Sequence, residues 1–211
     1  MSVYASSHPL VKHKVSLLRD DKISVKSFRE LTKELAVLLT MEATTQLSLE
    51  NKPLTCWSGI ISAPMLSEKQ PTLVPILRAG LGMLDGALSI LPCAKVSVVG
   101  LKRDEQTLQP ISYYQNIVND VSERQAIIID PMLATGSSMV LAYRALLSKG
   151  KPKHCHIVSL IASSEGIEYT KKHLPENCTI WVGAIDQEMT AQSYIVPGLG
   201  DAGDLAFGTK E

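Results

Sequence analysis

One segment near the middle of the chain constrains the fold more than any other. Residues 126–130 read Ala-Ile-Ile-Ile-Asp, an apolar run that ends on an acid. A short loop rich in hydroxyl groups follows, and then a helical pattern over residues 138–149. A strand that is apolar at every position is usually buried on both faces of a sheet. A buried strand that leads through a short loop into a helix predicts a parallel sheet covered by helices.

The same alternation of apolar strand and helix extends over most of the chain. Strands are predicted at 73–77, 95–101, 126–130, 156–162 and 179–186. Helices are predicted at 82–91, 138–149 and 165–173. The pattern therefore predicts an α/β fold with a mostly parallel sheet flanked by helices. In such sheets, ligands bind at the carboxyl ends of the strands.

We expect residues 1–211 to form a single domain with three parts. Residues 1–45 are predicted to be an N-terminal helical arm, with Ser24 as a helix N-cap. Residues 73–186 form the α/β core, and residues 187–211 form a small hood and loop. Between arm and core, residues 51–72 are interrupted by prolines and a glycine. This stretch is predicted to be a loop, and short strands within it are left open.

Composition argues against several classes of protein. Lys and Arg number 21, as do Asp and Glu, so the net charge is zero, whereas broad binding of nucleic acid or anionic membranes usually requires a basic excess. No apolar run approaches the roughly 18 residues of a membrane span, and no signal peptide is recognisable at the N-terminus. The four cysteines form no C-x-x-C pair, which favours reduced thiols. We therefore expect a cytoplasmic protein without nucleic-acid or membrane partners.

The loop from Asp130 to Ser138 is the first candidate for binding chemistry. Free backbone N–H groups at a helix start suit a phosphate monoester, and nearby hydroxyls can add hydrogen bonds. Gly136 allows close approach of the backbone, and the Asp130 carboxylate could accept hydrogen bonds from a ribose diol. The alternative is structural: Ser137 or Ser138 would be an N-cap, and Asp130 a loop acid. The segment is no Walker A loop, because it lacks the G-x-x-x-x-G-K-[ST] pattern.

Two arginines follow predicted strands. Arg78 leaves the strand at 73–77 directly before a glycine-flanked helix start. A pyrophosphate would compensate its charge, and the alternative is an ion pair with an acid such as Asp85. Arg103 lies in the charged stretch 100–105, which in isolation is typical of a solvated turn. We expect residues 101–118 to form a flap or hairpin over the site.

The third candidate is a glycine-rich loop at 194–204. It contains G-x-G-x-x-G at positions 198, 200 and 203. Only eight residues follow Gly203, too few for the helix, strand and acid that a dinucleotide site requires. A loop of this kind is better suited to wrap a small planar ligand with its backbone, the alternative being a flexible tail.

These segments together resemble a known family. The sequence IIIDPMLATGSS at 127–138 is similar to the phosphoribosyl pyrophosphate (PRPP) loop of the type I phosphoribosyltransferases. PILRAGLGM at 75–83, the stretch at 100–108 and YIVPGLGDAGDLAFGT at 194–209 resemble uracil phosphoribosyltransferases in particular. The resemblance departs from the wider superfamily where Asp130 is followed by Pro131 instead of a second acid. It also departs at Ser137, often glycine, and at Lys102, where tyrosine is common.

The resemblance implies a reaction and a set of site residues. The implied reaction is transfer of the phosphoribosyl group from PRPP to uracil, giving UMP and pyrophosphate. Mg²⁺ is implied as cofactor, bound mainly through PRPP, with no protein metal ligand assigned. The implied catalytic residues are Asp201 and Arg103. The residues implied to bind PRPP are Arg78, Arg103, Asp130, Pro131, Met132, Leu133, Ala134, Thr135, Gly136, Ser137, Ser138 and Asp201. Those implied to bind uracil are Ile195, Gly200, Asp201 and Ala202.

The resemblance further implies a homodimer or larger homo-oligomer, and activation by GTP, as in some relatives, stays open. Three rival functions stay open as well. The first is a pyrimidine-sensing, RNA-binding regulator on the same fold, against which the zero net charge counts. The second is a transferase for a purine or for orotate, although the loop at 194–209 carries no cation to pair with the orotate carboxylate. The third is a dinucleotide-dependent oxidoreductase.

Overall fold

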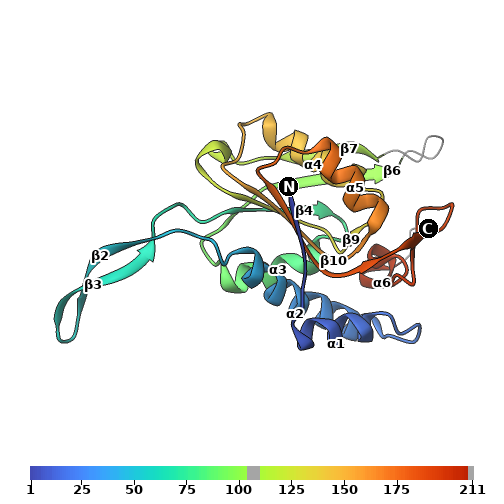
Figure 1. The fold of residues 1–211 in the computed structure, drawn as a ribbon, viewed down its shortest axis with the longest axis horizontal. Coiled ribbons are helices and arrows are strands. Elements are labelled where there is room, and N and C mark those ends of the chain that lie inside the picture. The colour runs from blue at the N-terminus through green and yellow to red at the C-terminus, as the bar shows by residue number, and fades with distance from the viewer. Residues whose placement is uncertain (104–109, 209–211) are drawn as a thin grey trace.

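The computed structural model describes residues 1–103 and 110–208, with the side chain of Arg103 left out (Figure 1). The helices in the described residues are α1 (Pro9–Leu18), α2 (Val25–Ala43), α3 (Leu81–Ile90), η1 (Val121–Glu123, a 3₁₀ turn), α4 (Ser137–Leu147), α5 (Ser164–His173) and α6 (Ala202–Phe207). The strands are β1 (Ser2–Ala5), β2 (Leu49–Cys56), β3 (Gly59–Leu66), β4 (Thr72–Leu77), β5 (Lys95–Val96), β6 (Val98–Arg103), β7 (Pro110–Asn116), β8 (Ala126–Ile129), β9 (Met132–Leu133), β10 (Cys155–Ser163), β11 (Cys178–Asp186), β12 (Glu188–Met189) and β13 (Ile195–Val196).

A mostly parallel sheet lies at the centre, as the sequence predicts. Within the described residues it has nine strands, in the order β1-β11-β10-β8-β4-β6-β7, with β5 paired to β4 and β9 to β10. Every pairing is parallel except that of β7 with β6. Along the chain the sheet grows from β4 to β6 on one side and then to β8 on the other. The order of the strands thus reverses at β4, which places a ligand-binding crevice at the carboxyl ends of these three strands.

Both faces of the sheet are buried, which explains why its strands are apolar at every position. In β8, Ile127 and Ile129 belong to a hydrophobic cluster with α1, α2 and α3, whereas Ala126 and Ile128 belong to a second cluster with α4 and α5. Successive side chains of a strand point to opposite faces, so one short strand contributes to both cores. Figure 1 shows the two sets of helices on either side of the sheet.

The N-terminal region contains the helix that its apolar spacing predicts, and also a strand that it does not. Ser24 is the N-cap of α2, and its hydroxyl accepts a hydrogen bond from the Ser27 N–H. Residues 2–5, predicted as part of a helical arm, instead form β1, which pairs in parallel with β11. Ser2 of β1 pairs with Thr179, which lies 177 residues away in the sequence, so no local pattern identifies the strand.

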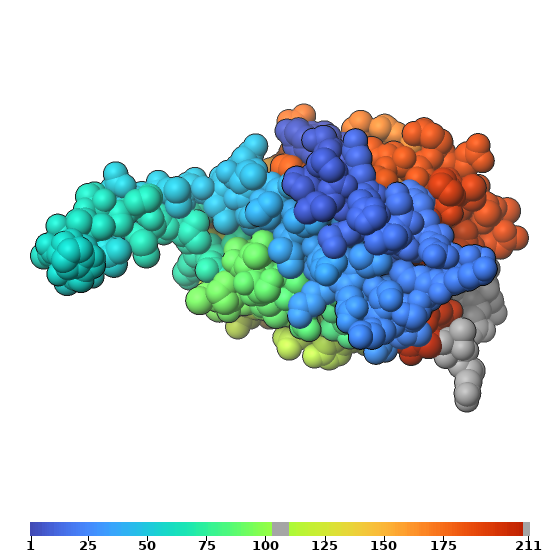
Figure 2. Space-filling model, turned by 90° about the horizontal axis from the view of Figure 1, so that it is seen from below, coloured from blue at the N-terminus to red at the C-terminus, as the bar shows by residue number. Residues whose placement is uncertain are grey.

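Residues 51–72, predicted to be a loop in which short strands were left open, contain two strands over most of their length. Strands β2 and β3 form an antiparallel hairpin of eight residues a strand, with Pro53 opposite Ser62 and Asn51 opposite Pro64. Each strand of a two-stranded hairpin has one edge without a partner, and proline is tolerated there because no N–H is needed. The hairpin projects from the body of the molecule in both views (Figures 1 and 2). Its apolar side chains are largely exposed.

The hairpin predicted over 101–118 is present as the antiparallel pair β6 and β7, whereas residues 104–109 lie outside the described part of the chain. No helix in the described ranges has both the length and the hydrophobicity that crossing a membrane requires.

Candidate active site

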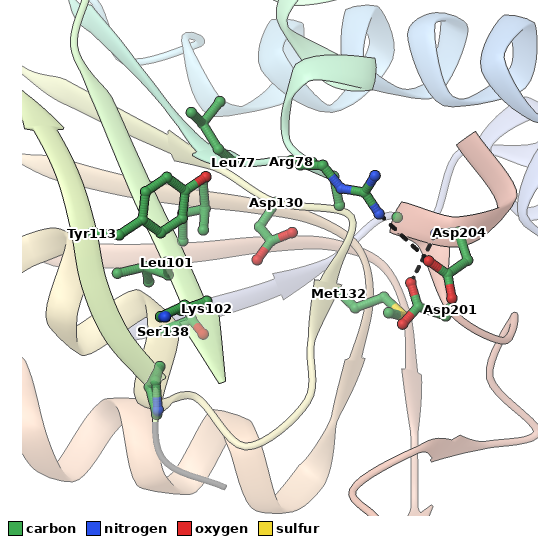
Figure 3. A pocket seen from close by; sticks show the side chains of 14 residues that line it. Leu77, Arg78, Leu101, Lys102, Tyr113, Asp130, Met132, Ser138, Asp201 and Asp204 are labelled. Atoms are coloured by element: carbon green, nitrogen blue, oxygen red, sulfur yellow. Dashed lines mark hydrogen bonds and ion pairs between the residues drawn. The ribbon is translucent and has the colours of Figure 1, made fainter. Parts of the chain in front are cut away.

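A large pocket opens at the carboxyl ends of β4, β6 and β8. Its volume is about 940 Å³, and strand ends, the start of α4 and the C-terminal helix α6 all contribute to it (Figure 3). The lining residues are Ile76, Leu77, Arg78, Ala79, Leu101, Lys102, Pro110, Tyr113, Asp130, Met132, Ser138, Asp201, Gly203 and Asp204. Four segments far apart in the sequence therefore meet here, and they are the four segments in which candidate residues were predicted.

The start of α4 borders this pocket through Ser138, whereas Thr135, Gly136 and Ser137 are not among the described residues that line it. Gly136 is the N-cap of α4 in a left-handed conformation with φ of 78°, so the expected alternative of a serine N-cap is wrong. A Cβ at Gly136 would lie 2.5 Å from Thr170 Oγ1 and 2.7 Å from the Gly166 carbonyl oxygen. The hydroxyls of Thr135 and Ser137 are 2.7 Å apart. The helix thus begins without a side-chain cap, beside a hydroxyl pair, an arrangement suited to a phosphate group.

Arg78 provides positive charge on the other side of the pocket. It follows β4 directly, and its Nη2 lies 3.5 Å from Asp204 Oδ1 and 3.4 Å from the Gly208 carbonyl oxygen. The acid that pairs with Arg78 is therefore Asp204 of α6 and not Asp85. Figure 3 shows the guanidinium directed toward Asp204, whose own N–H donates to the Asp201 carboxylate at 3.0 Å. Since the ion pair is partly exposed, an anionic ligand could compete with Asp204 for the guanidinium.

Asp130 lies at the end of β8 between these two sides. Its N–H donates to the Val158 carbonyl of β10, which fixes the backbone in the sheet. Burial raises the pKa of the Asp130 carboxyl to about 8; a hydrogen bond from the Met132 N–H opposes this rise, and the charge of Asp201 adds to it. A carboxyl group with such a pKa takes up a proton readily near neutral pH and favours ligands that bring hydroxyl donors or positive charge.

A smaller cavity of about 240 Å³ adjoins the large pocket. Its lining residues are Met132, Ala134, Gln192, Ser193, Tyr194, Ile195, Gly200 and Asp201. Met132 and Asp201 line both cavities. The small cavity is formed mainly by the glycine-rich C-terminal segment, in which Asp201 is the N-cap of the six-residue helix α6. The large pocket is therefore lined by cationic side chains and the start of a helix, whereas the small cavity is lined mainly by a loop.

Some of the predicted site residues do not face either cavity. Pro131 and Leu133 are buried, and Leu133 packs in the core on the α5 side of the sheet. Ala202 is also buried, in the core on the other side. For these residues only backbone groups remain to meet a ligand. Arg103 ends β6, whose carboxyl end reaches the pocket, but its side chain lies outside the described part of the structure.

Other lining residues were not predicted as site residues. Asp204, Tyr113 and Lys102 line the large pocket, and Gln192 and Ser193 line the small one. The unusual lysine at position 102 was the available sequence signal for the region of Lys102 and Tyr113. Gln192 and Ser193 carry no sequence signal. Within residues 1–103 and 110–208, no group of three or more His, Cys, Asp or Glu side chains is placed to hold a metal ion.

Comparison with known proteins decides the family. A family model described as "Uracil phosphoribosyltransferase" matches residues 5–209. The chain belongs to this family. Among solved structures, the AQ2163 protein from Aquifex aeolicus is 38% identical, with a TM-score of 0.92 and 98% of each chain covered. A hypoxanthine-guanine phosphoribosyltransferase from Bacillus anthracis shares the fold at 13% identity, with a TM-score of 0.51, over 81% of this chain and 83% of that one.

Membership of the uracil phosphoribosyltransferase family establishes the type of reaction. The chain is a transferase of the type I phosphoribosyltransferase superfamily, which moves a phosphoribosyl group from PRPP to a base. The mostly parallel sheet flanked by helices agrees with the fold that the sequence predicts. The rival reading as a dinucleotide-dependent oxidoreductase is thereby wrong.

Proposed function

We propose that the base is uracil and that the protein salvages it in the cytoplasm by forming UMP and pyrophosphate from uracil and PRPP. The observation that carries this proposal is the pair of adjoining cavities that share Met132 and Asp201. The large cavity suits a polyanionic sugar phosphate, and the small one suits a flat molecule held by loop backbone. C1 of the ribose would then lie near the shared wall, where the new bond forms.

In this proposal the large cavity binds PRPP. The N–H groups at the start of α4 and the nearby hydroxyls hold the 5-phosphate. Asp130 accepts hydrogen bonds from the two ribose hydroxyls, which stabilise its charged form. Arg78 and Arg103 bind the pyrophosphate, with Arg78 exchanging its contact with Asp204 for phosphate oxygens. Charge that develops on the leaving pyrophosphate strengthens these contacts in the transition state.

The glycine-rich segment supplies base specificity in this proposal. Uracil presents an acceptor, a donor and an acceptor at O2, N3–H and O4. Backbone N–H groups near Gly200 and Ala202 and a carbonyl near Ile195 would match that pattern. Cytosine reverses two of the three positions and would leave buried groups unpaired, at a cost of about 1–3 kcal/mol each. Mismatches of this kind can discriminate between bases by about 10⁴-fold.

The chemical step exchanges one bond at C1 for another. The bond from C1 to the pyrophosphate oxygen breaks, and pyrophosphate leaves with the electron pair. N1 of uracil bonds to C1 and loses its proton, for which Asp201 is the proposed acceptor. Asp201 lines both cavities, which supports this assignment. An Asp201→Asn variant with unchanged kcat would remove that role.

The donor set of the large pocket is suited to Mg²⁺ that arrives with PRPP. Mg²⁺ prefers oxygen ligands and usually keeps few protein ligands beside substrate phosphates. Asp130 and Asp201 would face the ion, and the charge of Asp201 already raises the pKa of Asp130, a repulsion that a divalent cation would relieve. When bound, Mg²⁺ supplies neutralisation of pyrophosphate charge.

A turnover assay tests the proposed function. PRPP and Mg²⁺ are supplied with uracil, cytosine, orotate, hypoxanthine or adenine, and pyrophosphate release and product mass are measured. We expect turnover with uracil, and with cytosine at least about 10⁴-fold less. If another base is turned over at a comparable rate, the proposal that uracil is the substrate is wrong. Tight UMP binding without any turnover would favour a sensor. A parallel series with GTP tests activation.

We also propose that the hairpin β2–β3 packs against a second copy of the chain. Trp57 at its tip is 99% exposed and Ile60 is 75% exposed. The other exposed apolar side chains of the hairpin are Leu49, Leu54, Ile61, Met65 and Leu66. A two-stranded hairpin in water is marginally stable on its own, and exposed apolar patches of this kind mark protein interfaces.

Substitution in the hairpin tests this assembly. A Trp57→Ser, Ile60→Ser double variant removes two exposed apolar side chains without touching the core, so the fold should be retained. We expect light scattering to show homo-oligomers for the wild type and a concentration-dependent loss of them for the variant. An exposed-residue control, Val25→Ser in α2, should leave assembly unchanged. A wild type that is monomeric at micromolar concentration would contradict the proposal.

A further inference from the structure

An ion pair outside the two cavities connects the N-terminal helices to the base-binding segment. Arg19, the C-cap of α1, donates from Nη1 to Asp186 Oδ2 and from Nη2 to Asp186 Oδ1, both at 2.8 Å. Asp186 is the last residue of β11, at the carboxyl edge of the sheet. The Asp186 side chain is 7% exposed and that of Arg19 22%. A bidentate pair whose carboxylate is buried has a more fixed geometry than a pair between two exposed side chains.

The same two side chains hold both backbone groups of Gly198. Arg19 Nη1 donates to the Gly198 carbonyl oxygen at 2.7 Å, and the Gly198 N–H donates to Asp186 Oδ2 at 3.1 Å. Gly198 has a φ of 62°, and a Cβ there would lie 2.0 Å from the Ile195 carbonyl oxygen. The segment is therefore tightly folded at this residue, and the ion pair fixes it to the sheet edge.

Gly198 lies between two residues that line the small cavity. Ile195 is three residues before it, and Gly200 is two residues after it. Neither Arg19 nor Asp186 is among the described residues that line either cavity. The pair can therefore act on a ligand only by setting the position of the loop. A displacement of the order of 1 Å in a positioning group can reduce activity by about 10²-fold.

We propose that Arg19 and Asp186 are positioning residues that set the affinity for the base through Gly198. The inference rests on the proposed function, since it assigns the base to the small cavity. Under that function Arg78, Asp130 and the start of α4 hold PRPP, and none of them makes a hydrogen bond to this pair among the described contacts. Asp201, which lines both cavities, accepts its hydrogen bond from the Asp204 N–H of α6. Loss of the pair should therefore raise KM for uracil and leave KM for PRPP nearly unchanged.

The experiment measures KM for both substrates, kcat and thermal stability. Arg19→Met removes the donors and keeps an apolar stem of similar length. We expect KM for uracil to rise about tenfold or more, because one charged hydrogen bond to the loop and the bidentate pair are lost. KM for PRPP should change less than twofold. Arg19→Lys keeps the charge but cannot bond to both partners in the same geometry, so it should give a smaller rise.

A matched control comes from the same helix. Lys14 of α1 pairs with Glu34 of α2, on the surface and away from Gly198. Lys14→Met should leave both KM values unchanged while removing a different ion pair made by the same helix. If Arg19→Met and Arg19→Lys raise the KM of both substrates equally, or raise neither in a folded protein, the proposal is wrong.

A second readout does not depend on the reaction. Hydrogen exchange of the amides at 195–201 reports local opening of the loop. In Arg19→Met these amides should exchange about tenfold faster or more, as expected from loss of a hydrogen bond to a charged group, while the amides of β8 keep wild-type protection. Unchanged exchange at 195–201 would overturn the positioning role. Failure of the wild type to use uracil would instead contradict the proposed function and leave the exchange result to decide the role of the pair.

Discussion

The two cavities of the site are held in place by different means. In the large one, Arg78 and Asp130 follow strands of the central sheet, and the Asp130 N–H still bonds to the neighbouring strand. In the small one, the elements are two strands of two residues and a helix of six. Arg19 and Arg29, from outside that segment, hold it by hydrogen bonds to its backbone. Backbone pairing thus fixes one half of the site, and a few side chains fix the other.

The largest effect is expected at Gly136, in the half of the site that the sheet and α4 hold, because no side chain fits at this position. Gly136→Val forces a Cβ against Thr170 Oγ1 and the Gly166 carbonyl at a positive φ. We expect unfolding free energy to fall by about 3 kcal/mol, from strain and overpacking together, with loss of PRPP binding. Chemical denaturation and calorimetry with PRPP measure both. Gly59→Ala is the control, because Gly59 also has a positive φ but no atom within 4 Å of the added Cβ; equal losses in the two variants would show that packing around Gly136 contributes nothing.

A change of intermediate size is expected at Asp130. Asp130→Asn should lower kcat/KM for PRPP by about 10- to 100-fold, the range for a lost hydrogen bond to a charged group. It should also alter stability with pH. The pKa of Asp130 is raised to about 8 from an ordinary 3.8, so the folded, ligand-free wild type loses stability as the pH rises from about 4 through 8. Asparagine removes that loss, and the variant should be the more stable protein at pH 9.

Urea denaturation between pH 4 and 9, with EDTA present, measures this difference. Asp120→Asn provides a control of opposite sign. Arg124, Lys95 and Lys69 lower the pKa of Asp120, so its stabilising effect is present at neutral pH and is lost as the pH falls toward its lowered pKa. That variant should be less stable than the wild type at pH 7. Parallel stability curves for wild type and Asp130→Asn would contradict the assigned burial of Asp130.

The smallest effect is expected at Arg29, whose side chain helps to hold the C-terminal segment beside the small cavity. Arg29 of α2 donates from Nε to the Ala206 carbonyl oxygen at 2.7 Å, and its guanidinium lies 5.8 Å from the centre of the Phe207 ring. Arg29→Met should raise KM for uracil about two- to fivefold, because a partly exposed hydrogen bond contributes about 0.5–1.5 kcal/mol. KM for PRPP should stay constant. Lys26→Met, which removes an exposed cation from the same helix, should change neither value, and an equal rise in both variants would assign the effect to net charge.

The sheet and its helices were predictable because their signals are local. The apolar run 126–130 predicts a buried strand, and Ser24 predicts a helix N-cap. Each prediction needs only a few neighbouring residues. The hairpin β2–β3 was left open as short strands within a loop, because Pro53 and Pro64 interrupt strands in most contexts and are accepted at the free edges of a hairpin. Strand β1 was missed because its order comes from distant pairing with β11.

The site was predictable to the extent that its residues follow strands or precede a helix. Arg78, Asp130 and Asp201 come together at one pocket. The partner of Arg78 was not predictable, since Asp204 is 126 residues away in the sequence. The same holds for Gln192 and Ser193, which line the small cavity without any motif. The position of a side chain within a loop depends on tertiary contacts that the local sequence does not encode.

The wall that the two cavities share has a consequence for ligands that span it. Met132 and Asp201 line both compartments, so under the proposed function a molecule that joins a base to a sugar phosphate occupies both at once. Binding of its second part is then intramolecular and benefits from a high effective concentration. Under the proposed function, UMP is such a bivalent ligand and should compete with both substrates. A flat base tethered to an anionic phosphate mimic is therefore the architecture that an inhibitor of this site should have.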